Sequence, residues 1–423
     1  MKRNYFIVGL ILLIFFVISF LTNILGPLIP DIIDSFKLSL TLAGFLPFSF
    51  FVAYGVMSIP AGFLVEKYRE KRVILVAFVI AFAGALLFAS FSSFSVAMFS
   101  LFLIGLGMAM IQVAINPLLR VAGGEEHFAF NSVLGQLVFG LASFLSPQVY
   151  TYLVQNLHGY AGGGDMIVRT LAKVVPADLP WISLYWVFTF ITLAMIVVIA
   201  SSRFPRVELK EDEKAGAKET YRDLFKNKFV ILYFFGIFAY VGSEQGVANW
   251  ISKFLVTYHG YNPQTVGADT VSLFWGLLTA GCLLGLLMLK IFDSRRVLIW
   301  FTGAALVSLT FALFGPGKVA LIAFPLVGFF ASVMWSVIFS LALNSVKRHH
   351  GSFSGILCTG IVGGAIVPLI VGWLGDFFGL RFGMMFLYLT LGYILSIGFW
   401  SKPLITNVTF RDRKKNLSAD AVK

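Results

Sequence analysis

The feature that most constrains this chain is a series of about a dozen long apolar stretches separated by short polar segments. Of its 423 residues, 59% are hydrophobic and only 12% are charged. A soluble domain is roughly 45–50% apolar and about 25% charged. One helical crossing of a bilayer takes about 20 residues, so the apolar content suffices for twelve crossings. We therefore predict an all-α integral membrane protein with twelve transmembrane helices.

The predicted helices fall into two sets of six on either side of one long hydrophilic linker. They are 6–29, 41–65, 73–91, 96–119, 130–154 and 181–201 in the first set, and 229–257, 270–289, 297–314, 319–345, 352–374 and 382–400 in the second. The corresponding parts of the chain are an N-terminal bundle (1–202), a linker (203–228), a C-terminal bundle (229–402) and a tail (403–423). The first stretch is too long for the apolar part of a signal peptide, so we count it as a helix.

The positive charges are unevenly distributed between the two sides of the predicted membrane. With the N-terminus in the cytoplasm, 26 of the 32 lysines and arginines fall on the cytoplasmic side and 5 on the outer side, and Lys253 lies within a helix. This bias predicts a multi-pass protein of the cytoplasmic (inner) membrane with both termini in the cytoplasm. The net charge of +12 is then explained by topology and membrane lipid, and not by nucleic-acid binding.

Motifs for other function classes are missing from the sequence. There is no phosphate-binding loop, dinucleotide fingerprint or nucleophile elbow, and the five histidines lack metal-ligand spacing. We therefore predict no enzyme, no organic cofactor and no resident metal.

The two halves resemble each other at an offset of 221–223 residues. Pro147 and Pro368 correspond at 221, and Gly62 and Gly285, which precede basic loops, correspond at 223. A parallel six-plus-six repeat is the architecture of the major facilitator superfamily, in which the substrate site lies between the halves near the membrane midplane. The expected fold is therefore two pseudo-symmetric six-helix bundles.

Glu244 lies near the middle of the predicted helix 229–257. A carboxylate at mid-bilayer costs at least ~2.5 kcal/mol, and such residues usually face an ion or substrate pathway. We predict Glu244 as the ion-coupling residue. It either carries a proton together with the substrate, or stays ionised and holds sodium with oxygens of Asn23 and Gln245. We favour sodium at this point, because the clustered amide oxygens would be idle in a proton relay.

The remaining polar groups of the membrane interior are mainly amides and indoles. Amides both donate and accept hydrogen bonds, which suits an uncharged sugar, and an indole offers a flat surface to a sugar ring. The predicted substrate-binding residues are Asn23, Gln112, Asn116, Asn131, Gln136, Gln245, Asn249, Trp250, Trp275 and Trp335. The alternative is that these amides only join neighbouring helices, at ~0.6 kcal/mol each on average.

The loop after the second predicted helix resembles a signature of the superfamily, in which a glycine precedes an acid and several bases. Glu66 at the helix end could pair with a base and accept N–H groups from a facing helix, closing the cytoplasmic side in one conformation only. A simple topology anchor is the alternative. The predicted gating residues are Glu66, Arg69, Arg72, Asp293 and Arg295.

Four stretches carry a more specific resemblance to the fucose–galactose–glucose symporter family of this superfamily. They are Ile59-Pro-Ala-Gly62, Gln112-Val-Ala-Ile-Asn116-Pro117, Tyr240-Val-Gly-Ser-Glu244 and Gly363-Gly-Ala-Ile-Val-Pro368. The resemblance covers nearly the whole chain and implies sugar transport. The family's fucose–proton symporter looks to use an Asp on helix 1 and a Glu on helix 4, where this sequence has Gly26 and Gln112. The chain thus resembles a glucose-type or divergent branch.

These observations predict a secondary active transporter that moves a neutral hexose or deoxyhexose by alternating access, coupled to a cation and functional as a monomer. The alternatives are a sugar uniporter or a carrier of another small polar metabolite, with Glu244 purely structural. A nutrient sensor with a transporter fold is a further alternative, which the short tail at 403–423 disfavours.

Overall fold

The computed structural model describes residues 5–123, 128–158, 160, 165–204, 218–346 and 350–404. Within these ranges twelve helical segments are long and apolar enough to cross a bilayer. All regular secondary structure of the described chain is helical, which confirms the all-α fold class.

The first half of the chain supplies six membrane segments. Its helices are α1 (Tyr5–Thr22), α2 (Leu25–Phe36), α3 (Leu40–Tyr68), α4 (Glu70–Ser90), α5 (Phe94–Gly123), α6 (Phe128–Leu157), the short α7 (Met166–Leu171), the turn η2 (Pro180–Ile182) and α8 (Ser183–Ser201). The predicted linker contains a nine-residue helix, α9 (Lys218–Lys226).

The second half supplies the other six segments. Its helices are α10 (Lys228–Ala248), α11 (Ile251–His259), η4 (Pro263–Gly267), α12 (Ala268–Ile291), α13 (Ser294–Phe314), α14 (Gly317–Ala331), α15 (Met334–Leu343), α16 (His350–Thr359), η5 (Gly360–Val362), α17 (Gly363–Phe378), α18 (Leu380–Met385) and α19 (Leu387–Trp400). The predicted tail lies outside the described residues from position 405 onwards.

Several segments predicted as single helices are interrupted. The first, 6–29, consists of α1 and α2 with a break at Asn23 and extends to Phe36. Pro27 explains this break, because its ring clashes with the carbonyl four residues earlier and it has no N–H to donate to that carbonyl. The seventh, 229–257, is broken at Asn249, and the segments predicted at 319–345, 352–374 and 382–400 are also divided.

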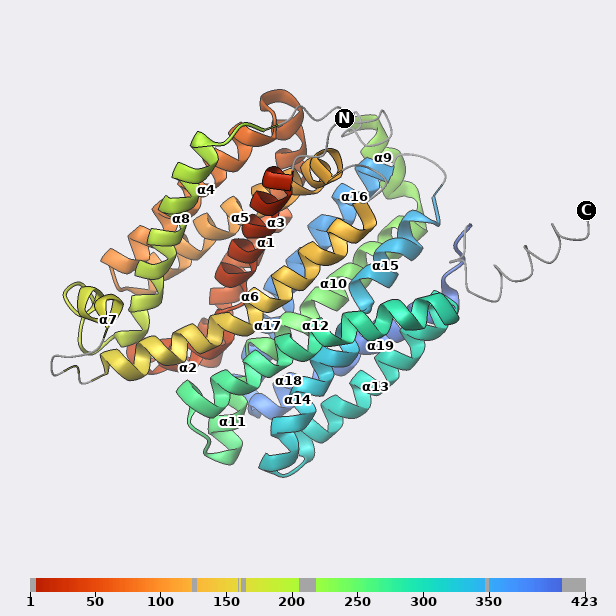
Figure 1. Ribbon diagram of the computed structural model, residues 1–423. Coiled ribbons are helices and arrows are strands. Elements are labelled where there is room, and N and C mark those ends of the chain that lie inside the picture. The colour runs from red at the N-terminus through yellow and green to blue at the C-terminus, as the bar shows by residue number, and fades with distance from the viewer. Residues whose placement is uncertain are drawn as a thin grey trace, which may run out of the picture.

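Two bundles pack side by side, with α1 to α8 in one and α10 to α19 in the other (Figure 1). They meet where α3 packs on α17 and α6 packs on α12. The starts of α1 and α10 and the linker helix α9 mark one end of the molecule, which we call the linker face. The ends of α2 and α11 and the helix α7 mark the other, which we call the distal face (Figure 1).

Glycines allow the two bundles to approach closely. A Cβ on Gly44 of α3 would lie 2.9 Å from the Cα of Leu369, and a Cβ on Gly372 of α17 would lie 2.4 Å from the carbonyl oxygen of Leu40. Small residues at a helix crossing let backbones touch, and packing of this kind stabilises helix pairs in membranes. The α3–α17 crossing is therefore a backbone-to-backbone contact.

Candidate functional site

At the break in the first membrane segment, the buried side-chain amide of Asn23 contacts the neighbouring helix α6. The Nδ2 of Asn23 donates a hydrogen bond to the Oγ of Ser143 at 2.8 Å. One turn earlier on α1, the Oγ of Ser19 lies 2.6 Å from the same Ser143 Oγ. It also donates to the Phe139 carbonyl at 2.5 Å. All three polar side chains are buried, so the N-terminal bundle holds a preformed polar cluster beside its helix break.

The C-terminal bundle contributes three polar side chains from α10 and its break, those of Glu244, Gln245 and Asn249. The Nε2 of Gln245 lies 3.4 Å from the Oδ1 of Asn23 and 3.3 Å from Oε1 of Glu244. The Nδ2 of Asn249 donates to Gln245 Oε1 at 3.4 Å. A continuous row of polar side chains therefore crosses from one bundle to the other. The structure thus brings together Asn23, Gln245 and Glu244, while their roles in binding and coupling stay predictions.

Glu244 is surrounded by few polar partners. Its carboxylate accepts a hydrogen bond from the hydroxyl of Tyr240, one turn earlier on α10, besides the contact from Gln245. Within the described part of the chain it forms no ion pair. A carboxylate has about four lone-pair sites, so two donors leave its hydrogen-bonding capacity incomplete. This arrangement suits a group that takes up and releases a cation.

The three predicted tryptophans occupy different environments. Trp250 is fully buried, and its indole N–H donates to the carbonyl of Pro368 on α17 at 3.1 Å. Trp335 packs against Tyr240 with ring centroids 6.1 Å apart. Trp275 is 2% exposed, and its indole nitrogen has no hydrogen-bond acceptor among the described residues. The buried indole nitrogen of Trp275 thus lacks an acceptor among the described residues, whereas that of Trp250 joins two helices.

The other predicted amides lie towards the linker face. Asn131 is buried and Gln136 is exposed near the start of α6, about three and two turns before Ser143. Gln112 is partly buried on α5. Asn116 also belongs to α5, but its side chain is outside the described part of the structure. No contact given for Asn131 or Gln136 joins them to the row of polar side chains, and the role of all four amides as substrate ligands stays a prediction.

Sequence reasoning missed Ser19, Ser143 and Tyr240 as members of the site. Two of them carry a detectable signal: Ser19 precedes Asn23 by four residues and Tyr240 precedes Glu244 by four, the spacing of side chains that share a helix face. Ser143 is one of three serines in the α6 sequence, with Ser132 and Ser146, and only the packing of α6 on α1 distinguishes it.

The predicted gating residues lie at the linker face. Glu66 and Arg72 are exposed, and Arg69 links α3 to α4 with a positive φ of 69°. Burial raises the pKa of the Tyr221 phenol on α9, and the nearby charge of Glu66 adds to this effect, so α9 lies close to the α3 end.

The predicted gating residues of the second half, Asp293 and Arg295, contact each other. Asp293 caps α13 by accepting from the backbone N–H of Arg295 at 2.9 Å and pairs with that residue's guanidinium at 3.1 Å.

Gly26 stands where the resemblance places an aspartate, and the structure leaves no room for a side chain there. A Cβ on Gly26 would lie 2.3 Å from the backbone oxygen of Ala248 in the other bundle. The described residues also contain no group of three or more His, Cys, Asp or Glu that could hold a metal ion. Of the acids and amides discussed, Glu244 alone places a carboxylate in the interbundle row.

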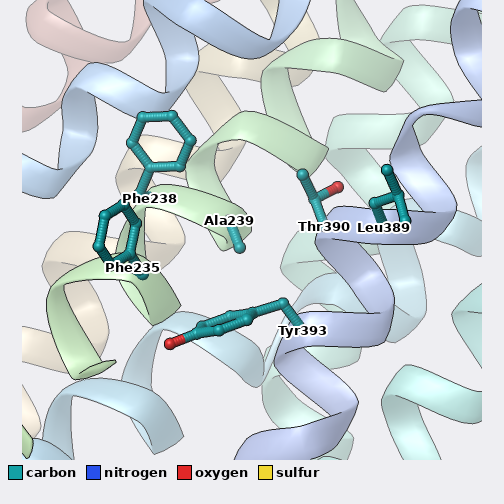
Figure 2. Close-up of a pocket in the computed structure, with 6 residues that line it drawn as sticks. All are labelled: Phe235, Phe238, Ala239, Leu389, Thr390 and Tyr393. Carbon is teal, nitrogen blue, oxygen red and sulfur yellow. The ribbon is translucent and has the colours of Figure 1, made fainter. Parts of the chain in front are cut away.

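A separate pocket lies between α10 and α19 (Figure 2). It is lined by Phe235, Phe238, Ala239, Leu389, Thr390 and Tyr393. Leu389 is 68% exposed, and the hydroxyl of Thr390 is already paired with Ser243 at 2.7 Å. The pocket is therefore an apolar recess open at the outer surface of the bundle, unsuited to a polar ligand.

Comparisons with known proteins agree with this architecture. The family model of the Major Facilitator Superfamily matches residues 11–367. A glucose/galactose transporter of Brucella abortus is 31% identical over 403 residues, covering 94% of each chain. The L-fucose-proton symporter of Escherichia coli is 24% identical over 399 residues, covering 89% of this chain and 88% of that protein.

Solved structures share the fold. The structure of the E. coli fucose:proton symporter has 22% identity and a TM-score of 0.68, covering 95% of this chain and 100% of that one. A bacterial homologue of the human lysosomal transporter Spinster, in an inward-facing and occupied conformation, has 13% identity and a TM-score of 0.78, with 95% and 97% covered. With the family model spanning most of its length and a relative above 30% identity over nearly all of it, this chain is a membrane transporter of the major facilitator superfamily.

Proposed function

We propose that this protein is a cation-coupled symporter that moves a neutral hexose or deoxyhexose by alternating access between its two bundles. The observation that carries the proposal is the row of polar side chains in which Asn23 of one bundle meets Gln245 and Glu244 of the other. A substrate bound there touches both bundles, so its binding can bias their relative position. Relatives named as glucose/galactose transporter and L-fucose-proton symporter support the choice of sugar.

The composition of the site supports a neutral substrate. Its donors and acceptors are amides, hydroxyls and an indole, with Glu244 as the single carboxylate of the row. Such groups match the hydroxyls of a sugar, which both donate and accept. The indole of Trp275, which has no acceptor among the described residues, is proposed to add a donor together with a flat apolar surface. A dianionic substrate would require a positive charge, and the row contains none.

Glu244 is the coupling group of this proposal, and the geometry favours the proton over sodium. The Oδ1 of Asn23 and the Oε1 of Gln245 both already accept hydrogen bonds, which leaves few free oxygens for a hard cation that prefers several oxygen ligands. A proton needs only the carboxylate. The name of the E. coli relative, a proton symporter, points the same way.

The proposal also includes orientation, assembly and a gate. Among the described residues, most of the lysines and arginines lie at the linker face. By the positive-inside rule this face is proposed to face the cytoplasm, with both termini there and the bundles in the inner membrane. The row of polar side chains is formed by the two bundles of one chain, so a monomer in contact with lipid contains a full transport path. Glu66 at the end of α3 acts as the cytoplasmic gate.

The proposal is tested by uptake into proteoliposomes containing the purified protein. A panel of labelled hexoses is offered while a pH gradient and a sodium gradient are imposed in separate experiments. We expect at least one neutral hexose to accumulate when the interior is alkaline, and no accumulation with sodium alone. Binding of a dianion or a peptide, with no hexose protecting the protein in a thermal-shift panel, would contradict the proposal.

Substitution of the coupling residue sharpens this test. Glu244→Gln keeps the size of the side chain and its acceptor oxygen but cannot carry a proton. We expect it to abolish accumulation against a gradient while sugar exchange across the membrane continues. Asp178→Asn, which changes an exposed carboxylate outside the membrane segments, is the matched control and should accumulate normally. Continued accumulation by Glu244→Gln would remove Glu244 from the coupling mechanism.

A further inference from the structure

An aspartate of one bundle caps a helix of the other at the distal face. Asp376 lies near the end of α17. Its Oδ1 accepts the backbone N–H of Leu40 at 2.8 Å. Its Oδ2 accepts the backbone N–H of Thr41 at 2.8 Å and the Thr41 hydroxyl at 2.5 Å. The ordinary N-cap of α3, Ser39, accepts only from Leu42.

The contact therefore has the character of a helix cap supplied from outside the helix. The first N–H groups of a helix have no partner within it, and they carry a partial positive charge that favours a carboxylate. Asp376 satisfies two of them, and α3 satisfies both oxygens of Asp376. The partners belong to different bundles, so the pairing exists only while the two distal ends are together.

The backbone beneath the cap is packed as tightly as helices allow. Gly372, one turn before Asp376, faces the carbonyl of Leu40, where a Cβ would lie 2.4 Å away. A Cβ on Gly375 would lie 2.9 Å from the side chain of Leu40. The cap thus forms over a crossing at which the backbones of α3 and α17 lie in direct contact.

A second set of contacts joins the bundles on the other side of the distal face. The Thr151 hydroxyl of α6 donates to the backbone oxygen of Gln264 at 2.8 Å, and the Gln264 side chain donates to Asp31 at 3.0 Å. Gln148 donates to Asp269 at 3.0 Å. These contacts are single amide or hydroxyl bonds, whereas Asp376 concentrates three donors on one carboxylate.

We propose that Asp376 and the first turn of α3 form the latch that holds the distal face closed, and that this latch opens each time the transporter admits substrate from that side. The inference rests on the alternating access of the proposed function. It assigns to the distal face the role that Glu66 is proposed to have at the linker face. Loss of a single helix cap corresponds to a change of about fivefold in an equilibrium constant. When Asp376 is replaced, we therefore expect the ratio of molecules with a closed distal face to those with an open one to fall by at least that factor.

The latch is tested by measuring the distance between the distal ends of the bundles. The full chain is prepared with its free cysteines, Cys282 and Cys358, replaced by serine. Spin labels are attached through Met166→Cys, which is 83% exposed on α7, and Lys318→Cys, which is exposed on α14. Double electron–electron resonance in lipid nanodiscs then reports the distribution of distal separations without any substrate.

We expect Asp376→Ala to increase the long-distance population at least fivefold, and Thr41→Val, which removes one of the three donors, to produce a smaller shift in the same direction. Asp178→Ala, at an exposed carboxylate on the same face, should leave the distribution unchanged. If Asp376→Ala does not fold, Asp376→Asn and Thr41→Val provide the same comparison with less disturbance.

A distribution unaltered in both Asp376 variants and in Thr41→Val would overturn the latch. Because the measurement uses no sugar and no ion gradient, this result is distinguishable from a failure of the proposed function, which the uptake panel alone decides.

Discussion

At the scale of single residues, position 26 illustrates how packing restricts chemistry. Gly26 of α2 lies against the backbone of Ala248 at the end of α10, beside the breaks that bring Asn23 and Gln245 together. A carboxylate at this position would have to separate the two bundles. The absence of an acid at position 26 is therefore linked to this contact, and in the proposed function the coupling role falls to Glu244.

This contact gives a prediction for Gly26→Ala. The added methyl group would lie 2.3 Å from the Ala248 oxygen, so the distal ends must move apart, and overpacking of this kind costs about 1–3 kcal/mol. We expect a lower melting temperature in detergent and slower sugar exchange. Gly9→Ala is the control, because a Cβ there meets nothing within 4 Å; equal behaviour of the two variants would contradict the steric argument.

The residues of the site differ in how well the sequence predicts them. Glu244 and Asn23 stand out because polar groups are costly in an apolar segment, and the structure joins them through Gln245. Trp250 was predicted as a sugar contact on residue type alone, yet its N–H is bound by Pro368. Residue type shows that an indole needs a partner when buried, but only tertiary packing shows whether that partner is protein or ligand.

At the scale of elements, the two broken segments have different causes. The α1–α2 break follows from Pro27 and can be predicted from the sequence. The α10–α11 break has no proline four residues after it, and it occurs where Trp250 bonds to α17, so it depends on a helix more than a hundred residues away. The breaks at Asn23 and Asn249 also lie slightly further apart than the 221–223 offset of the sequence repeat.

The different environments of two tryptophans give a prediction at this scale. Trp250→Phe removes the hydrogen bond between the α10–α11 break and α17, worth about 0.6–1.7 kcal/mol between membrane helices, and should lower the melting temperature while leaving the sugar KM almost unchanged. Trp275→Phe removes an N–H that has no acceptor among the described residues, so we expect a raised KM and little change in melting temperature. A raised KM in Trp250→Phe together with a lowered melting temperature in Trp275→Phe would contradict the roles proposed for the two indoles.

At the scale of the whole molecule, apolar length and the charge bias predict twelve segments, and the fold confirms them. The packing between the bundles could not be predicted, because it depends on which small residues face each other across α3 and α17.

The helix α9 was also missed: its nine residues lie in a charged linker without a long apolar pattern. Its Tyr221 approaches Phe63 of α3, with ring centroids 6.5 Å apart, so the linker contacts the N-terminal bundle.

The two proposed gates, Glu66 and Asp376, lie on opposite faces, so weakening either one should favour opening at its own face. If Glu66 keeps the linker face closed in part of the cycle, Glu66→Ala should favour opening at that face, slow net transport, and leave sugar binding largely intact. The measurement is turnover in proteoliposomes together with binding by thermal shift. Unchanged turnover would identify Glu66 as a topology anchor, whereas loss of binding would place it in the substrate path.

The crossing of α3 and α17 has a practical consequence. Since Gly372 meets the Leu40 backbone with no intervening side chain, one added methyl group would push α3 and α17 apart at the distal face. A protein wedged in this way would dwell in a single conformer, which is the property that selection of conformation-specific antibodies and imaging of small membrane proteins both require. Substitution of Gly372 is thus a direct way to trap the carrier in a conformation with an open distal face.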